Sequence, residues 1–529
     1  MEHLVALSAI VCATAAFSAP IREVADRMPA GHDYALAIAL GEGFAQGLAD
    51  GHLYPRWLSE ANAGFGLPAL VGYPPLSGAM VGVAKLITGD TMAAFRVVIV
   101  LINFLSGLSF FVFARRFARP SVAGIGAALY LLAPYHVVVL YHRFAFAEFS
   151  CAIWIPLVLH YGLSLRARPS LGAALGLAAS FAAVVVSHVV VAQMVVVGIG
   201  AVVLVTSKPW RHPTRALTMG AALLGSLALA GAYVVPLLLS RDLVHWDAQY
   251  GPTRGFPFLF ALRGDLFTTI VELAFLVQAA CLAPLLPLLR RTRNGALLTC
   301  IAAALLVTAL HTAITYPIWR WLPGMEYLLY PYRFGILASL FVPLAFVWTM
   351  DRRPRLAALA LVGCVGGLIA LPTVFDQPRW VNLHEHPVVV WNQEHIPRSV
   401  GSVWQRGPME ERVVLSGNAT AQVLEWRSHS RRFLVDVDDT QSRVRVATWF
   451  YPGWQAEIDG APITVGPEAI SGLIMFDLER GHHEVTLHFE DTPDRVAGKV
   501  VSAVAWIVFL ALLSLAFVRR RRRLARAAP

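Results

Sequence analysis

The residues in this sequence that could do chemistry are ionisable side chains that stand alone between long apolar runs. Asp33 ends Gly31-His-Asp33, and Arg143 and Glu148 stand five residues apart. Arg333 lies within Tyr330-Pro-Tyr-Arg-Phe334. Carboxylates are proton-transfer groups, and an ionisable group at membrane depth usually faces a cavity or a partner. These residues are therefore the first candidates for a functional site.

Each candidate also has a purely structural interpretation. Asp33 could cap the helix expected after it, and each arginine could extend back to a membrane surface. His188 and His311, expected at the outer ends of apolar segments, could each be packing residues. If all of these residues lie at one depth, a single polar ring explains them more economically than separate anchors.

The elements that must position these residues are membrane helices. Of the 529 residues, 57% are hydrophobic and only 14% are charged, against about 25% charged in a typical soluble domain. The net charge is +10, and much of the excess positive charge lies in short arginine clusters at the ends of apolar runs. Such clusters are typical of cytoplasmic loops. The charge thus indicates orientation and requires no nucleic-acid partner. All five cysteines lie in apolar runs, so no disulfide framework is expected: Cys12, Cys151, Cys281, Cys300 and Cys364.

Apolar stretches of spanning length predict twelve spans, with both termini in the cytoplasm. The expected spans are 4–19, 92–113, 121–137, 149–164, 170–187, 190–206, 216–238, 268–289, 295–314, 334–350, 356–373 and 499–518. The first could be a signal peptide, but its start carries Glu2 and no Lys or Arg, which favours an uncleaved anchor. Segment 75–89 is short and, as a span, would leave Arg115 and Arg116 outside. We expect a re-entrant or interfacial helix there, on the outer face.

Three regions follow from these spans. Residues 1–373 form the transmembrane domain with an outer loop over 20–91, 374–498 lie outside the membrane, and 499–529 are the last helix and a basic cytoplasmic tail. Alternating stretches at 431–438, 442–448 and 483–489 predict strands, and Asp459-Gly460 predicts a hairpin. The expected fold class is a polytopic α-helical membrane protein with a small extracytoplasmic β-sandwich near the C-terminus.

Polar chemistry is concentrated on the expected outer side. Most of the 17 histidines and nearly all carboxylates fall there, whereas the expected cytoplasmic loops are rich in arginine. ATP and nucleotide sugars are not available at the outer face of the cytoplasmic membrane. An enzyme working there needs a substrate that a lipid carries to it.

The order of motifs resembles the multi-spanning glycosyltransferases of the GT-C class. The resemblance is to YfhO-like proteins and to the membrane family labelled 6-pyruvoyl-tetrahydropterin-synthase-related. It is carried by Asp33, Gly51-His-Leu-Tyr-Pro-Arg-Trp57, Tyr73-Pro-Pro75, Arg143 with Glu148, Ser187-His188 and Tyr330-Pro-Tyr-Arg-Phe334. Near the C-terminus it is carried by Glu394-His-Ile-Pro397, Tyr451-Pro-Gly-Trp454, Asp459-Gly460 and Gly481-His-His-Glu-Val485. The resemblance covers nearly the whole chain.

The resemblance implies a transferase that uses a polyprenyl-phosphate-linked sugar and a cell-surface glycan or lipid acceptor. It favours inversion, but the sequence leaves open whether the transfer is retaining or inverting. Asp33 matches the carboxylate that deprotonates the acceptor hydroxyl in such enzymes. Arg333, then Arg143, are the candidates to hold the leaving phosphate, because guanidinium binds phosphate in a bidentate manner. Further candidates for substrate binding are His32, Glu148, His188, Arg56, Tyr332 and His311.

The resemblance leaves metal dependence open. Many enzymes of this class carry an Asp-Glu pair in the first outer loop, whereas Asp33 here stands between His32 and Tyr34. No cofactor is required by the sequence. A divalent ion such as Mg²⁺ or Mn²⁺, if bound, would be held by Asp33, His32, Glu148 and His188.

Two other functions fit the same pattern. One is a transporter or flippase of a lipid-linked saccharide, although no internal repeat with midplane binding groups is evident. The other is a non-catalytic envelope assembly protein whose β-domain binds a partner or glycan. The sequence does not identify the sugar or the acceptor.

Overall fold

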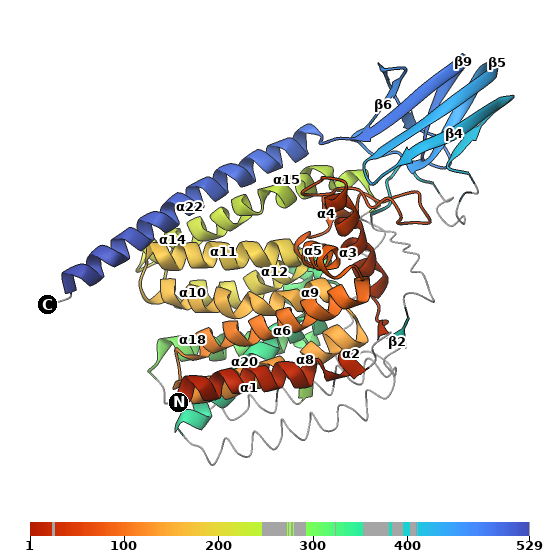
Figure 1. Cartoon of the computed structure of the whole chain (residues 1–529). Coiled ribbons are helices and arrows are strands. Elements are labelled where there is room, and N and C mark those ends of the chain that lie inside the picture. The colour runs from red at the N-terminus through yellow and green to blue at the C-terminus, as the bar shows by residue number, and fades with distance from the viewer. Residues whose placement is uncertain are drawn as a thin grey trace.

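The computed structural model is a bundle of helices with an antiparallel sheet at one end (Figure 1). It describes residues 1–23, 27–245, 293–322, 324–352, 380–382, 395–401 and 411–527, with isolated positions at 272, 275, 276, 279 and 409. Both termini lie at the end of the bundle opposite the sheet (Figure 1). If the bundle spans a membrane, the sheet and the termini are on opposite faces of it.

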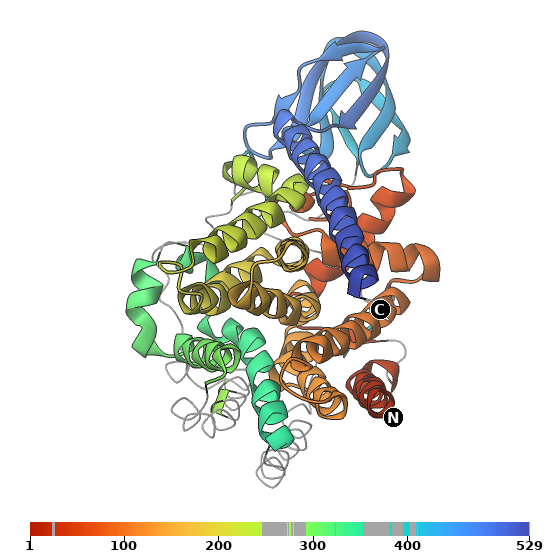
Figure 2. The ribbon, with the colours of Figure 1, turned by 90° about the vertical axis from the view of Figure 1, so that its left-hand side faces the viewer.

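The bundle is built from helices that are apolar on most sides. The main ones are α1 (Glu2–Phe17), α6 (Thr91–Ala114), α7 (Pro120–Leu131), α10 (Ile155–Ala167), α11 (Leu171–Ser187), α14 (Pro213–Leu229), α15 (Gly231–Ser240), α18 (Gly295–Leu310), α20 (Gly335–Arg352) and α22 (Pro493–Ala527). Polar side chains cap several N-termini: Asp90 accepts from Ala93 N–H at 2.7 Å, and Asn294 caps α18. In the view from the end with the termini, α22 descends from the sheet across the front of the bundle (Figure 2), where it packs on α15 and α14.

Within the described residues, four helices are long and apolar enough to cross a membrane, and up to eight spans result if each bent pair counts as one. The four are Thr91–Ala114, Val189–Thr206, Pro331–Arg352 and Pro493–Arg519. Helices α1 and α11 are apolar but shorter. Only positions 272, 275, 276 and 279 of the expected span 268–289 are described, and the expected span 356–373 lies outside the described residues. The chain is therefore a helical membrane protein, and the number of twelve spans stays a prediction.

The first outer loop folds into two packed helices, α3 (Tyr34–Ala49) and α5 (Leu76–Thr88). Gly78 and Gly82 of α5 lie against the backbone of α3: a Cβ at Gly82 would lie 2.9 Å from the backbone nitrogen of Ala45, and one at Gly78 would lie 3.2 Å from the carbonyl oxygen of Leu40. The opposite side of α5 exposes Val83, Leu86 and Ile87. The helix expected over 75–89 thus forms as an amphipathic helix packed on α3, with an apolar stripe left free of protein.

The C-terminal region contains a seven-stranded antiparallel sheet of order β3-β5-β9-β6-β7, in which β4 also pairs with β5 and β8 with β9. The strands are β3 (Val413–Leu415), β4 (Ala419–Trp426), β5 (Ser430–Trp449), β6 (Trp454–Ile458), β7 (Ala461–Ile463), β8 (Gly466–Pro467) and β9 (Leu473–Phe489). Alternate residues of β5, such as Phe433 and Val435, are buried. Asp459 and Gly460 both have positive φ between β6 and β7, which confirms the predicted hairpin.

The first outer loop and the sheet share one hydrophobic core. Trp57 packs edge-on against Trp454 with ring centroids 5.4 Å apart, and Phe65 stacks on Trp449 at 5.4 Å. The backbone N–H of Trp449 donates to the carbonyl of Phe65 at 2.9 Å. A second, two-stranded sheet joins β1 (Met28–Pro29) to β2 (Trp380–Val381). The loop therefore connects the membrane helices to the C-terminal sheet.

Candidate functional site

Asp33 stands at the N-terminus of α3 and faces Arg143. It occupies the capping position, but its side chain makes no capping hydrogen bond. Asp33 Oδ2 lies 3.6 Å from Arg143 Nη2, and 43% of the Asp33 side chain is exposed. Its backbone N–H donates to the carbonyl of Arg143 at 2.9 Å. Gly31 permits this contact, since a Cβ there would lie 2.1 Å from the Arg143 carbonyl carbon. Asp33 is thus an accessible carboxylate held against a buried cation.

Arg143 also forms an ion pair with a second, fully buried carboxylate. Arg143 Nη1 lies 2.7 Å from Glu148 Oε2, and the Glu148 side chain is 0% exposed. The hydroxyl of Tyr135 donates to Glu148 Oε1 at 2.9 Å. Arg143 follows a π-helical turn over Val138–His142, and Glu148 lies in the short helix α9 (Phe146–Ser150). With both of its oxygens engaged, Glu148 is suited to hold Arg143 in place and is poorly placed to accept a substrate proton.

Arg333 supplies a second cation, for which the described residues offer no carboxylate partner. It lies in a 3-10 turn over Pro331–Phe334, at the start of α20. Its guanidinium carbon lies 5.3 Å from the centroid of the Tyr330 ring, and Tyr332 lies under Arg143 at 5.6 Å. Within the described part of the chain no carboxylate forms an ion pair with Arg333, and its Nε is buried without a hydrogen-bond partner. Arg143, Glu148 and Asp33 are all within electrostatic reach. This leaves a positive charge available for an anion.

His188 lies at the same place between α11 and α12 (Val189–Val195). Its Nδ1 accepts a hydrogen bond from the backbone N–H of Val191 at 3.3 Å. Glu148, Arg333, Arg143 and Asp33 are within electrostatic reach of its ring. The structure therefore brings together five of the residues expected in a single polar ring. The helix break expected at Ser187-His188 is also present.

Three other candidates occupy different surroundings. His32 lies near His142, beside Asp33 in the chain. His311 bonds through Nδ1 to the carbonyl of Val307 at 2.8 Å and packs 6.4 Å from Phe334, as a packing histidine would. Arg56 is buried far along the first outer loop, where it donates to the carbonyls of Leu70 and Ala232.

Arg56 belongs to a junction between the outer loop and the sheet. Its backbone N–H donates to His429 Nε2 at 3.0 Å, and His429 Nδ1 lies 3.0 Å from Ser428 Oγ. Ser428 Oγ donates in turn to Asp50 Oδ2 at 2.6 Å. Burial, with the adjacent His52 and Arg431, lowers the pKa of His429 to about 3. His429 is therefore neutral and acts in the docking of the sheet.

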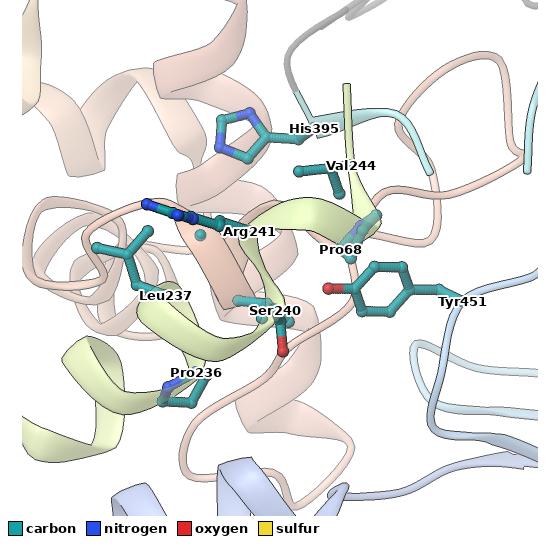
Figure 3. Close-up of a pocket in the computed structure, with 10 residues that line it drawn as sticks. Pro68, Pro236, Leu237, Ser240, Arg241, Val244, His395 and Tyr451 are labelled. Carbon is teal, nitrogen blue, oxygen red and sulfur yellow. The ribbon is translucent and has the colours of Figure 1, made fainter. Parts of the chain in front are cut away.

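A small cavity lies at the same junction (Figure 3), and Asp33 is not among the residues that line it. It is lined by Pro236 and Ser240 of α15, by Arg241, by His395 and by Tyr451 of the sheet region, among others (Figure 3). Burial lowers the pKa of His395 to about 4. None of the polar residues that surround Arg143 lines this cavity.

Metal binding finds no support in the side chains that the structure describes. Among those residues, no group of three or more His, Cys, Asp or Glu could hold an ion. Of the four expected ligands, Glu148 is engaged by Arg143 and Tyr135, and His188 uses Nδ1 to cap a helix. The donor set therefore does not fit a divalent metal.

Two residues of this site were not expected from the sequence. Tyr135 sits in Ala-Pro-Tyr-His within an apolar run, where an aromatic residue is typical of packing. Its ring lies so close to Gly335 that a Cβ on this glycine would be 2.3 Å from it. Gly31 likewise has no signal beyond its place before Asp33. Their roles depend on contacts between segments distant in sequence.

Residues 72–376 match the model of the family described as "6-pyruvoyl-tetrahydropterin synthase related domain; membrane protein". The match covers more than half of the chain. The chain belongs to this family. Membership was expected from the motifs and is confirmed. The matched residues include Arg143, Glu148, His188 and Arg333, whereas Asp33 precedes them and the seven-stranded sheet follows them. No curated protein matches the sequence.

Several solved glycosyltransferase structures are similar to this family member at low identity. ArnT from Cupriavidus metallidurans, bound to undecaprenyl phosphate, is 17% identical with a TM-score of 0.45, over 69% of this chain and 64% of that one. The Archaeoglobus fulgidus oligosaccharyltransferase is 12% identical with a TM-score of 0.43, over 71% and 55%. The arabinofuranosyltransferase AftD from Mycobacteria is 16% identical with a TM-score of 0.43, over 75% and 30%. This chain thus spans less than two thirds of the length of each.

Proposed function

We propose that this protein is a membrane glycosyltransferase that moves a sugar from a polyprenyl-phosphate-linked donor to a glycan or lipid acceptor. The transfer would occur at the outer face of the cytoplasmic membrane. The observation that carries the proposal is the contrast between two carboxylates beside Arg143: Glu148 is 0% exposed and Asp33 is 43% exposed. One carboxylate is structural, and the other is free to meet a substrate.

In the proposed reaction Asp33 accepts the proton of the acceptor hydroxyl. The acceptor oxygen then bonds to the anomeric carbon while the bond from that carbon to the phosphate oxygen breaks. The electron pair of the broken bond leaves with the polyprenyl phosphate, whose charge Arg333 would receive. A single displacement of this kind inverts the anomeric carbon. General-base assistance is typically worth about 10²–10⁴ in rate.

The sequence made Arg143 a candidate to hold the leaving phosphate, but in this proposal it positions Asp33. Its guanidinium already contacts Asp33 and Glu148, so it is engaged by two carboxylates. Arg333 has no such partner among the described residues and is the better phosphate-binding group. Arg143 would instead hold Asp33 in its ionised form and in a fixed orientation.

The proposal includes the number of spans and the orientation of the chain in the membrane. Twelve spans, cytoplasmic termini and an extracytoplasmic β-sandwich over 374–498 would place Asp33 on the face where lipid-linked sugars are presented. The position of both termini opposite the sheet supports this arrangement (Figure 1). The sheet, docked on the outer loop by Trp57 and Phe65, would lie beside the acceptor.

Purified protein in liposomes, supplied with a polyprenyl-phosphate-linked sugar and an extract of cell-surface glycans, tests the proposal. We expect sugar to appear on an acceptor and free polyprenyl phosphate to be released in equal amount. Movement of the intact donor between leaflets with no release of polyprenyl phosphate would contradict the proposal and favour a flippase. Neither transfer nor movement, with glycan binding retained, would favour an assembly protein.

A further inference from the structure

The hydrogen bond at the end of α11 assigns the position of the proton on His188. His188 has an extended backbone (φ −162°, ψ 106°) and caps the helix that begins at Val189. Its Nδ1 accepts from the backbone N–H of Val191, so the lone pair of Nδ1 is occupied. A neutral imidazole carries its proton on the other nitrogen when one nitrogen is an acceptor. The ring therefore presents Nε2–H away from the helix.

The surroundings of this N–H favour an anion. His188 as a residue is partly exposed, and the structure shows no hydrogen bond from its Nε2 to any described residue. Burial favours the neutral ring over the imidazolium. Arg333 and Arg143 act in the same direction, whereas the carboxylates of Glu148 and Asp33 oppose it. The buried carboxylate of Glu148 already accepts hydrogen bonds on both oxygens, from Arg143 and from Tyr135. An incoming anion would meet Arg333 and the N–H together.

We propose that His188 is a phosphate-binding residue, whose neutral Nε2–H donates a hydrogen bond to a phosphate oxygen of the lipid-linked donor beside Arg333. This inference rests on the proposed function for the identity of the ligand. His188 acts neither as a base nor as a metal ligand, because Nδ1 is committed to the cap and Nε2 carries the proton. The group recognised is a phosphate monoester or diester.

Asparagine at position 188 separates the two roles of the histidine. Asparagine is among the best N-cap residues, so His188→Asn keeps the cap and removes the distant N–H. His188→Ala removes both. His311→Asn is the matched control, because His311 also lies at the end of an apolar helix but bonds to its own turn at Val307.

The measurement is the affinity of each full-length variant for polyprenyl phosphate in lipid nanodiscs, with inorganic phosphate as competitor. We expect His188→Asn to raise the Kd for polyprenyl phosphate roughly tenfold or more, since a hydrogen bond to a charged group is lost. Its thermal midpoint should stay near that of the unmodified protein, whereas His188→Ala should lower the midpoint. His311→Asn should leave the Kd unchanged. Competition by inorganic phosphate would indicate a phosphate site that does not need the lipid.

Unchanged affinity in His188→Asn would overturn the inference. So would ¹⁵N spectra of the unmodified protein that place the proton of His188 on Nδ1, and this measurement decides the matter if the variants do not fold. The two proposals fail separately. A protein that binds polyprenyl phosphate through His188 but transfers no sugar would contradict the proposed function and leave this inference intact.

Discussion

At the scale of single residues, burial separates the charged side chains of this site into a structural pair and groups that a substrate can contact. Glu148 and Arg143 are enclosed and bonded to each other, whereas Asp33 is half-exposed and Arg333 has no carboxylate partner among the described residues. A buried ion pair with satisfied partners is chiefly a fixed framework. Its exposed neighbours are the groups that a substrate can reach.

Arg333→Gln should weaken donor binding more than it lowers stability. The variant removes the guanidinium of the site that has no carboxylate partner within the described ranges, and a charge-assisted hydrogen bond is worth about 1.5–3 kcal/mol. The Kd for polyprenyl phosphate should therefore rise at least tenfold. Arg320→Gln is the control, because Arg320 is exposed in the neighbouring helix α19 (Tyr316–Trp321). Equal weakening by both variants would indicate general attraction to anions and no specific site.

Glu148→Gln should lower stability sharply. The change leaves Arg143 buried without its closest carboxylate, a loss that costs about 3–5 kcal/mol in buried pairs. Chemical unfolding in detergent micelles measures this loss as the change in the free energy of unfolding. Glu42→Gln breaks the exposed pair with Lys85 and should cost about 1 kcal/mol or less. If the two variants unfold alike, Glu148 is not the framework residue that its burial indicates.

The sequence identified most of these residues but not their contacts. Isolated charges in apolar surroundings made Asp33, Arg143, Glu148 and Arg333 visible, because such charges are costly at membrane depth. Tyr135 was not visible, since a tyrosine in an apolar run usually packs through its ring. The division of labour between the two carboxylates depends on burial, which no local pattern encodes.

At the scale of elements, the site depends on chain segments that touch through backbone atoms. The start of α3 lies on the turn that carries Arg143, and Gly31 allows the approach. His188 is the N-cap of α12, and Arg333 lies two residues before α20 begins at Gly335. Each reactive group therefore stands at or next to a helix end, and of the three only His188 caps its helix through its side chain.

Gly31→Ala should reduce sugar transfer without unfolding the protein. A Cβ at this position would lie 2.1 Å from the carbonyl carbon of Arg143, so the segment that carries Asp33 must move. A displacement of about 1 Å can cost on the order of 10²-fold in rate. Gly172→Ala is the control, because a Cβ there has no neighbour within 4 Å. Full transfer by Gly31→Ala would show that the position of Asp33 does not depend on this contact.

Elements defined by local pattern were predictable, and those defined by distant contacts were not. Continuous apolar runs marked the helices, and Asp459-Gly460 marked a hairpin because both residues adopt positive φ readily. The packing of Trp57 and Phe65 into the sheet could not be foreseen, since the partners Trp454 and Trp449 lie almost four hundred residues away. A hydrophobic residue in the sequence indicates that its side chain will be buried, but not which residue it will pack against.

At the scale of the whole molecule, the outer loop joins the membrane helices and the sheet into one body. Arg56 connects α15, the outer loop and the sheet through three hydrogen bonds. The last helix, α22, packs on α15, where Gly498 meets the carbonyl of Gly231 closely. The site at Asp33 thus lies on the same loop that docks the sheet.

The docking of the sheet should weaken in acid. The folded pKa of His429 is about 3, below its ordinary value of 6.5, so between these values the unfolded state binds more protons. This stabilisation is present above pH 6.5 and is lost as the pH falls towards 3. At pH 5 the loss is about 2 kcal/mol. Asp50, His52, Arg431 and Asp491 also face the ring and contribute to its surroundings.

Thermal unfolding at pH 7.5 and pH 5 measures this effect, with His429→Gln as the comparison. Glutamine can still accept the N–H of Arg56 but does not titrate. The unmodified protein should therefore lose more stability on acidification than the variant does. An equal loss in both would show that His429 is not the titrating group.

The most direct test of the account is a paired measurement of donor binding and sugar transfer in Asp33→Asn. We expect the Kd for polyprenyl phosphate to stay unchanged, because Arg333 and His188 are intact, and transfer to fall about 10²–10⁴-fold because the general base is removed. Transfer at the full rate by Asp33→Asn would contradict it.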